Sequence, residues 1–292
     1  MVFIKNYLKS LRIRQWVKNL FIFAPILFSL NFTNIEYLRN SVLAFLLFSI
    51  IAGNIYVLND IIDRKKDIYH PKKKYRPIAS GSLKVLPALV FSFFILIIAL
   101  SAGFFFNKGF FIIALIYVVI NFLYSIYMKN IAIFDVFIIA IGFVLRVMIG
   151  GKINSIYLSP WLFIVTFLLA LFLGLVKRRQ ELVSGERDGW SSTRISLKNY
   201  SLPLIDQLIS ITTSATLISY IIYVLNPDIQ NYFHTKDLYL TVPFVIFGIF
   251  RYLFLTYIKE KGENPEEVIF SDLPFLINLI LWVGVFVILI YK

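Results

Sequence analysis

The chain contains no cysteine and few charged side chains. None of its 292 residues is cysteine, and only 15% are Asp, Glu, Lys or Arg, against roughly 25% in soluble globular domains. The missing thiols exclude disulfides, thiolate metal sites and a cysteine nucleophile. The low charge argues against a water-soluble enzyme, because a water-facing surface of this size needs more charged side chains. A hydrophobic content of 59% also excludes a disordered chain.

Long apolar runs take the place of the missing charge. They are rich in Phe, Ile, Leu and Val, and nine of them approach the roughly 20 residues that a helix needs to cross a bilayer. A β-barrel would instead show short segments of alternating polarity. The sequence therefore predicts an all-α polytopic membrane protein with nine transmembrane helices in a single domain, residues 1–292. The expected spans are residues 19–34, 40–62, 84–106, 109–127, 131–150, 158–176, 203–225, 238–258 and 272–291.

Basic residues give the expected orientation. Residues 1–18 mix Lys and Arg with apolar residues, which is typical of an amphipathic segment on the membrane surface. This segment and the loops 63–83 and 177–202 hold most of the Lys and Arg, so the positive-inside rule puts them in the cytoplasm. We expect a cell-membrane protein with a cytoplasmic N-terminus and a cytoplasmic active site. Its net charge of +13 fits anionic lipids or anionic substrates. Nucleic acid is not an expected partner, and a homo-oligomer is left open.

An acidic ladder ends the second expected span. Asn59, Asp63 and Asp67 follow the spacing i, i+4, i+8, which places them on one helix face. Asp60 lies on the flank of that face. Such oxygen ligands suit Mg²⁺, which proteins usually hold with one or two carboxylates and substrate phosphate oxygens. We therefore predict Asn59, Asp63 and Asp67 as metal ligands and Asp60, Asp63 and Asp67 as catalytic residues. The alternative is that the carboxylates cap the helix end and pair with residues 64–66.

Basic residues follow the acidic ladder closely in the sequence. Lys73, Lys74 and Arg76 surround Tyr75 in the loop, and Lys and Arg can neutralise the oxygens of a metal-bound diphosphate. A positive-inside loop without a ligand is the alternative. A second basic cluster, Lys177–Arg179, follows the sixth expected span.

Two ionisable residues lie within the fifth expected span. Such residues usually face a cavity or a partner. Asp135 is near the end expected to be cytoplasmic and is predicted to line the site, whereas Arg146 lies deeper and is expected to have a structural partner. Tyr124 and Lys129 lie near the preceding loop, within reach of the same site.

Four blocks of the sequence resemble the UbiA superfamily of intramembrane prenyltransferases, and within it the decaprenyl-phosphate phosphoribosyltransferase branch. The motif N-D-x-x-D-x-x-x-D resembles the first Asp-rich motif of that superfamily, and nine helices is its usual number. One departure is Ile13, where the branch often has proline. The similar blocks are Arg14–Asn19, Asn59–Gly81, Tyr124–Lys129 with Asp135 and Phe143–Gly151, and Lys177–Leu182.

The resemblance implies a UbiA-type transferase bundle and leaves two activities to compare, prenyl transfer and phosphoribosyl transfer. The prenyltransferases bind Mg²⁺ and a prenyl diphosphate through two Asp-rich motifs, but this chain has Lys177–Arg179 in the place of the second, with Glu181 as the nearest acid. One metal site and one basic site fit phosphoribosyl pyrophosphate (PRPP), which carries a diphosphate and a 5-phosphate. The implied reaction, with Mg²⁺ as cofactor, transfers 5-phosphoribose from PRPP to a polyprenyl phosphate for envelope glycan precursors, with Asp60 stabilising an oxocarbenium-like transition state.

The alternatives are an aromatic or quinone prenyltransferase of the same fold and a transporter of lipid phosphates. A transporter usually shows inverted repeats and broken helices with polar residues near the midplane, which this sequence does not. The residues predicted to bind substrate are Gln15, Lys18, Asn19, Asn59, Lys73, Lys74, Tyr75, Arg76, Tyr124, Lys129, Asp135, Lys177, Arg178 and Glu181.

Overall fold

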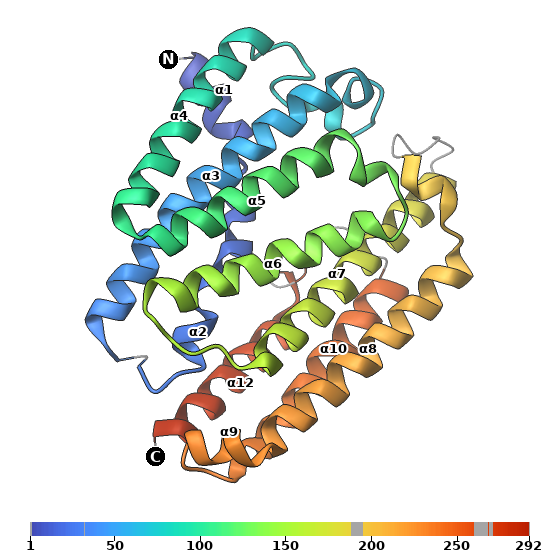
Figure 1. Cartoon of the computed structure of the whole chain (residues 1–292). Helices are drawn as coiled ribbons and strands as arrows, with labels where there is room; N and C mark the ends of the chain where they lie inside the picture. The colour runs from blue at the N-terminus through green and yellow to red at the C-terminus, as the bar shows by residue number, and fades with distance from the viewer. Residues whose placement is uncertain (1, 32, 188–194, 260–267, 269–270, 292) are drawn as a thin grey trace.

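The computed structural model is a bundle of long helices (Figure 1). It describes the chain except residues 1, 32, 188–194, 260–267, 269–270 and 292. Within those described residues it contains helices and turns and no strand, which confirms the predicted all-α class. Part of the second predicted loop, residues 188–194, lies outside the described residues.

Among the described residues, eight helices are long and apolar enough to cross a membrane. In Figure 1, α6 lies in the middle of the bundle, with α3, α4 and α5 on one side and α7, α8 and α10 on the other. Two apolar cores correspond to these sides, and α6 contributes residues to both. The helices are α3 (Ile35–Asp67), α4 (Val85–Phe106), α5 (Lys108–Ile126), α6 (Phe134–Ile153), α7 (Pro160–Arg187), α8 (Leu202–Leu225), α10 (Val242–Tyr257) and α12 (Leu273–Tyr291).

Short elements connect these helices. They include the α-helices α1 and α9 and several short 3₁₀ helices, of which η3 carries Lys129 and η4 carries Ser196. The short elements are α1 (Val2–Ser10), η2 (Lys73–Tyr75), η3 (Met128–Asn130), η4 (Ile195–Asn199), α9 (Pro227–Tyr232) and η5 (Asp237–Thr241).

The first predicted span, residues 19–34, does not form a long α-helix, so the predicted number of nine is not confirmed. The chain forms the 3₁₀ helix η1 (Ile13–Phe23) and a single turn, α2 (Ala24–Leu27). A 3₁₀ helix rises about 2.0 Å per residue, so η1 covers roughly 22 Å. It packs along α3 and α6, and Ile22 and Ile26 are fully buried.

The amphipathic segment predicted over residues 1–18 ends earlier than expected. Helix α1 stops at Ser10, and Arg12 takes a left-handed conformation with φ 53°. The Tyr7 hydroxyl lies 2.8 Å from Ser92 Oγ and also bonds Asn54, so α1 is attached to α3 and α4. Residues 13–18 already belong to η1.

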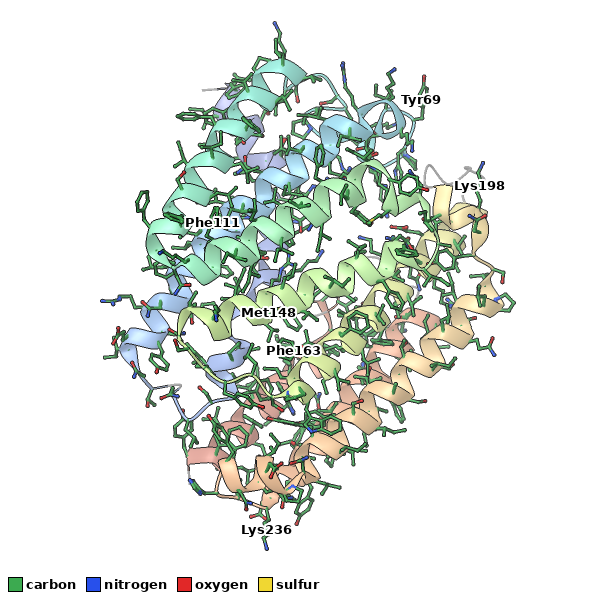
Figure 2. All side chains as sticks on the ribbon, viewed as in Figure 1. Tyr69, Phe111, Met148, Phe163, Lys198 and Lys236 are labelled. Carbon is green, nitrogen blue, oxygen red and sulfur yellow. The ribbon has the colours of Figure 1, made fainter. Side chains whose placement is uncertain are left out.

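The two polar loops lie at the same end of the bundle. Figure 2 shows Tyr69, after α3, and Lys198, before α8, at one end, and Lys236 at the opposite end. Figure 1 shows the two chain ends at opposite ends of the bundle. Large side chains such as Phe93, Phe94 and Phe105 are exposed along the sides, as expected for a surface that faces lipid.

Candidate active site

The acidic ladder forms the last turns of α3. Because α3 continues unbroken to Asp67, the spacing that the sequence predicts is a real helical spacing. The side chains are not equally open: Asp60 and Asp67 are buried, whereas Asn59 and Asp63 are half-buried. The ladder therefore lies at the border between the bundle interior and the loop region.

Cations from three other segments hold these carboxylates. Arg12, just before η1, pairs with Asp60. Arg76, in the loop after α3, places Nη1 3.0 Å from an oxygen of Asp60 and 2.7 Å from an oxygen of Asp67. Its guanidinium thus bridges two carboxylates of the ladder.

Lys129 holds the other half of the ladder. Its Nζ lies 2.6 Å from Asp63 Oδ1 and 3.5 Å from Asn59 Oδ1, and the side chain is almost fully buried. The ladder is therefore divided into an Asn59–Asp63 pair on Lys129 and an Asp60–Asp67 pair on Arg76. These ion pairs come from distant segments, and residues 64–66 are exposed.

The loop that carries Arg76 is folded back onto the bundle. The Leu83 N–H donates to the Pro77 carbonyl at 2.8 Å, and Ile78 and Leu83 are buried. Gly81 permits the turn with φ 79°, a conformation that costs glycine little. Arg76 is thus held by a packed loop.

The remaining predicted residues of this loop lie further out. Lys74 and Tyr75 are exposed, and the Lys74 ammonium lies 5.2 Å from the centre of the Tyr75 ring. Lys73 is half-buried, and its backbone N–H donates to His70 Nδ1. Lys74 and Tyr75 therefore contact each other on the outside of the loop.

The ladder fits a divalent ion that is shared with a substrate. Within the described part of the chain, no group of three His, Cys, Asp or Glu is arranged to hold a metal by itself. Mg²⁺ does not need such a cage, because it usually keeps waters and takes one or two carboxylates together with phosphate oxygens. Three carboxylates and the Asn59 amide oxygen at the end of α3 supply donors of that kind. The ligand set Asn59, Asp63 and Asp67 stays a prediction.

The two arginines of the second basic cluster form ion pairs with other residues of the protein. Arg178 is 1% exposed, and its Nε donates to Asp135 Oδ2 at 2.6 Å. Its Nη1 donates to Glu181 at 2.8 Å. Arg179 pairs with Asp206 at 2.7 Å, and Lys177 is half-buried. Asp135 and Arg178 therefore form a buried pair, not an open phosphate site, and their predicted substrate contacts stay untested.

Asp135 is the centre of a small network. It is fully buried and accepts hydrogen bonds from Arg178, from Ser196 Oγ at 3.2 Å and from the Tyr200 hydroxyl at 2.8 Å. Burial and the neighbouring carboxylate raise the pKa of the Tyr200 hydroxyl, so it stays a neutral donor. This network joins α6 and α7 to the segment around η4.

The other predicted residues are spread more widely. Gln15, Lys18 and Tyr124 are half-buried. Asn19 is buried, donates to Ser49 at 2.8 Å and accepts from Arg146 Nε at 2.8 Å. Since Ser49 precedes Asn59 by ten residues, Asn19 lies about 15 Å deeper along α3 than the ladder.

Arg146 has the structural partners that its depth predicts. Besides Asn19, it donates to the Gly142 carbonyl at 2.6 Å and to the Tyr117 hydroxyl at 3.2 Å. The rings of Phe48, Tyr117 and Phe143 lie about its guanidinium.

Sequence reasoning missed Arg12, Ser196 and Tyr200. Arg12 lies in the segment expected on the membrane surface, and the pattern of that segment does not reveal its contact with Asp60. Ser196 and Tyr200 lie in a polar loop without a motif of their own. Their roles depend on contacts with α6 that are distant in sequence.

Comparisons with known proteins identify relatives of this chain. The chain is 29% identical to a decaprenyl-phosphate phosphoribosyltransferase of Mycolicibacterium smegmatis, over 96% of this chain and 91% of that protein. It is 30% identical to a protein of the same name from Corynebacterium glutamicum, over 97% and 86%.

Solved structures show the same fold. A UbiA homologue from Archaeoglobus fulgidus, bound to GPP and Mg²⁺, superposes with a TM-score of 0.71 at 18% identity, covering 98% of this chain and 100% of the other. The model of the UbiA prenyltransferase family matches residues 20–280. This multi-pass integral membrane protein therefore belongs to the UbiA prenyltransferase family.

Proposed function

We propose that this protein transfers the 5-phosphoribosyl group of PRPP to a polyprenyl phosphate and releases pyrophosphate. One observation carries the proposal: four oxygen-bearing side chains at the end of α3 contact Arg12, Arg76 and Lys129 at one end of the bundle. A metal-bound diphosphate needs oxygen ligands for the metal and cations for its phosphate oxygens. The names of the relatives in Mycolicibacterium and Corynebacterium support the same donor and acceptor.

The donor would bind at this end of the bundle. Asn59, Asp63 and Asp67 would hold Mg²⁺, which when bound neutralises the negative charge that develops on the leaving diphosphate. In this structure Arg76 and Lys129 neutralise the carboxylates. They would turn toward the phosphate oxygens of the bound donor. Lys73, Lys74 and Tyr75 would contact the donor from the solvent side.

The acceptor phosphate needs no strong base, because it is already ionised at neutral pH. One of its oxygens forms a bond to C1 of the ribose, while the bond from C1 to the diphosphate oxygen breaks and pyrophosphate leaves with the electron pair. Asp60 would lie near the positive charge that develops on the ribose. Arg12 and Arg76 now neutralise Asp60, so this role requires that at least one of them turns toward the donor.

The membrane would surround the site and supply the lipid substrate. The end of the bundle that holds the site would face the cytoplasm, where PRPP is dissolved, and the polyprenyl tail would lie among the exposed apolar side chains in the bilayer. The product would supply lipid-linked pentose for envelope glycans. Gln15, Lys18, Tyr124, Lys177 and Glu181 remain candidates for contacts with the acceptor.

A direct assay tests the reaction. Purified protein in detergent is given PRPP, polyprenyl phosphate and Mg²⁺, and mass spectrometry searches for polyprenyl-phosphoryl-5-phosphoribose. The proposal expects this lipid and an equal amount of pyrophosphate, both lost when a chelator removes the metal. Prenylation of an aromatic acceptor, without any product from PRPP, would support the prenyltransferase alternative.

A further inference from the structure

A strained turn precedes α6. Ile133 has φ 71° and ψ −51°, and the Phe134 N–H donates to the Ala132 carbonyl at 2.9 Å. These values define the rare γ-turn with a positive φ at its centre, which is strained for any side chain and most of all for a β-branched one. The Ile133 side chain is 47% exposed, so burial does not explain why the turn is held.

One side chain from another segment holds this turn. The Tyr200 hydroxyl accepts a hydrogen bond from the Ile133 N–H at 2.6 Å and donates one to Asp135 Oδ1 at 2.8 Å. Tyr200 itself is buried. Its hydroxyl therefore fixes the strained residue and the first turn of α6 at the same time.

The turn separates two parts of the site. Lys129 lies four residues before Ile133 and reaches Asp63, and Asp135 lies two residues after it and holds Arg178. If Ile133 relaxed to a negative φ, the chain direction between η3 and α6 would change. Lys129 would then leave the carboxylates, because its backbone would move while α3 stays in place.

We propose that Tyr200 is a positioning residue, whose hydroxyl keeps the Ile133 turn closed and thereby holds Lys129 against Asp63 and Asn59. Its effect on turnover rests on the proposed function, whereas its effect on Lys129 does not. Strain held by tertiary contacts is frequent at functional sites, and here the strained residue lies four residues after Lys129, a cation of the site.

The first test is Tyr200→Phe, which removes the hydroxyl and keeps the ring. We expect turnover of PRPP to fall about tenfold or more, mainly in kcat, because the protein still folds but Lys129 is misplaced. We also expect an amine-reactive reagent to modify Lys129 faster, as followed by mass spectrometry, since that side chain is buried in the intact protein. Tyr69→Phe, at an exposed tyrosine of the same end, is the matched control.

The second test is rescue by Ile133→Gly. Glycine adopts positive φ without strain, so the turn should stay closed without its hydrogen bond. The double variant Tyr200→Phe/Ile133→Gly should recover much of the lost turnover and of the protection of Lys129. If the double variant is no better than Tyr200→Phe, or if Tyr200→Phe leaves Lys129 protected, the positioning role is wrong. If the intact protein makes no product from PRPP, the proposed function fails, and labelling of Lys129 still decides the role of Tyr200.

Discussion

At the scale of single residues, opposite charges are concentrated at one end of the bundle, where α3 ends. Asp63 is held by Lys129, and Asp67 by Arg76, although both cations lie outside the helix that carries the carboxylates. The helical spacing of the ladder could be predicted from sequence, because it depends on neighbours four residues apart. Arg76 and Lys129 could be predicted as residues of the site, but Arg12 could not, because it reaches Asp60 only through the fold.

Asp63→Asn tests the ladder. The amide keeps a hydrogen-bond acceptor for Lys129 but loses the charge that a divalent ion requires, so we expect turnover to be abolished while the protein still accumulates in the membrane. Turnover of PRPP is measured beside expression level. Asp237→Asn, at the opposite end, is the control and should keep full activity. Undiminished turnover of Asp63→Asn would remove Asp63 from the metal site.

Asp135 and Arg178 allow a test of buried charge. Each is almost fully buried, and removing one partner of such a pair typically costs about 3–5 kcal/mol, because the other charge is left without compensation. We expect Asp135→Ala to lower the Tm in detergent strongly, and Asp135→Ala/Arg178→Ala to lower it less than the two single effects added together. Strictly additive effects would mean that the pair does not stabilise the fold.

At the scale of elements, η1 is the main difference between sequence and structure. Hydropathy predicts a span over residues 19–34, but it cannot tell an α-helix from a 3₁₀ helix, because both bury an apolar run. In the structure η1 lies close against α6: a Cβ on Gly150 would lie 2.0 Å from the Ile22 carbonyl oxygen. The bounds of α4, α5 and α8 agree with prediction within a few residues, because each helix coincides with one continuous apolar run.

Gly150→Ala tests this contact. The added methyl group would push η1 away from α6, and overpacking of this kind typically costs about 1–3 kcal/mol. We expect a lower Tm and a loss of activity. Gly284→Ala in α12 is the matched control, since its Cβ would meet nothing within 4 Å, and helix propensity favours alanine there by roughly 1 kcal/mol. Equal Tm values for the two variants would show that η1 does not pack as described.

At the scale of the whole molecule, the two ends of the bundle are chemically different. The carboxylates and their cations lie at one end, whereas the opposite end has a cavity of about 330 Å³ whose walls include the aromatic side chains Phe28, Trp161 and Tyr223. Sequence predicted the polar end because basic loops concentrate there. The cavity could not be predicted, since it is formed by α2, α7, α8 and α9 together.

The lack of cysteine permits a clean test of orientation. Tyr69→Cys and Lys236→Cys each introduce a single exposed thiol, and Figure 2 shows these positions at opposite ends. With a cytoplasmic active site, a membrane-impermeant maleimide added to intact cells should label Lys236→Cys, and Tyr69→Cys only after permeabilisation. The reverse pattern would place the ladder outside the cell.

The most direct test of phosphoribosyl transfer is a competition between donors on the purified protein. Equal amounts of PRPP and a prenyl diphosphate are supplied with Mg²⁺, a polyprenyl phosphate and an aromatic acceptor, and all lipid products are measured by mass spectrometry. Phosphoribosyl transfer predicts polyprenyl-phosphoryl-5-phosphoribose as the main product, absent from Asp63→Asn. A prenylated aromatic product with no lipid-linked ribose phosphate would contradict it.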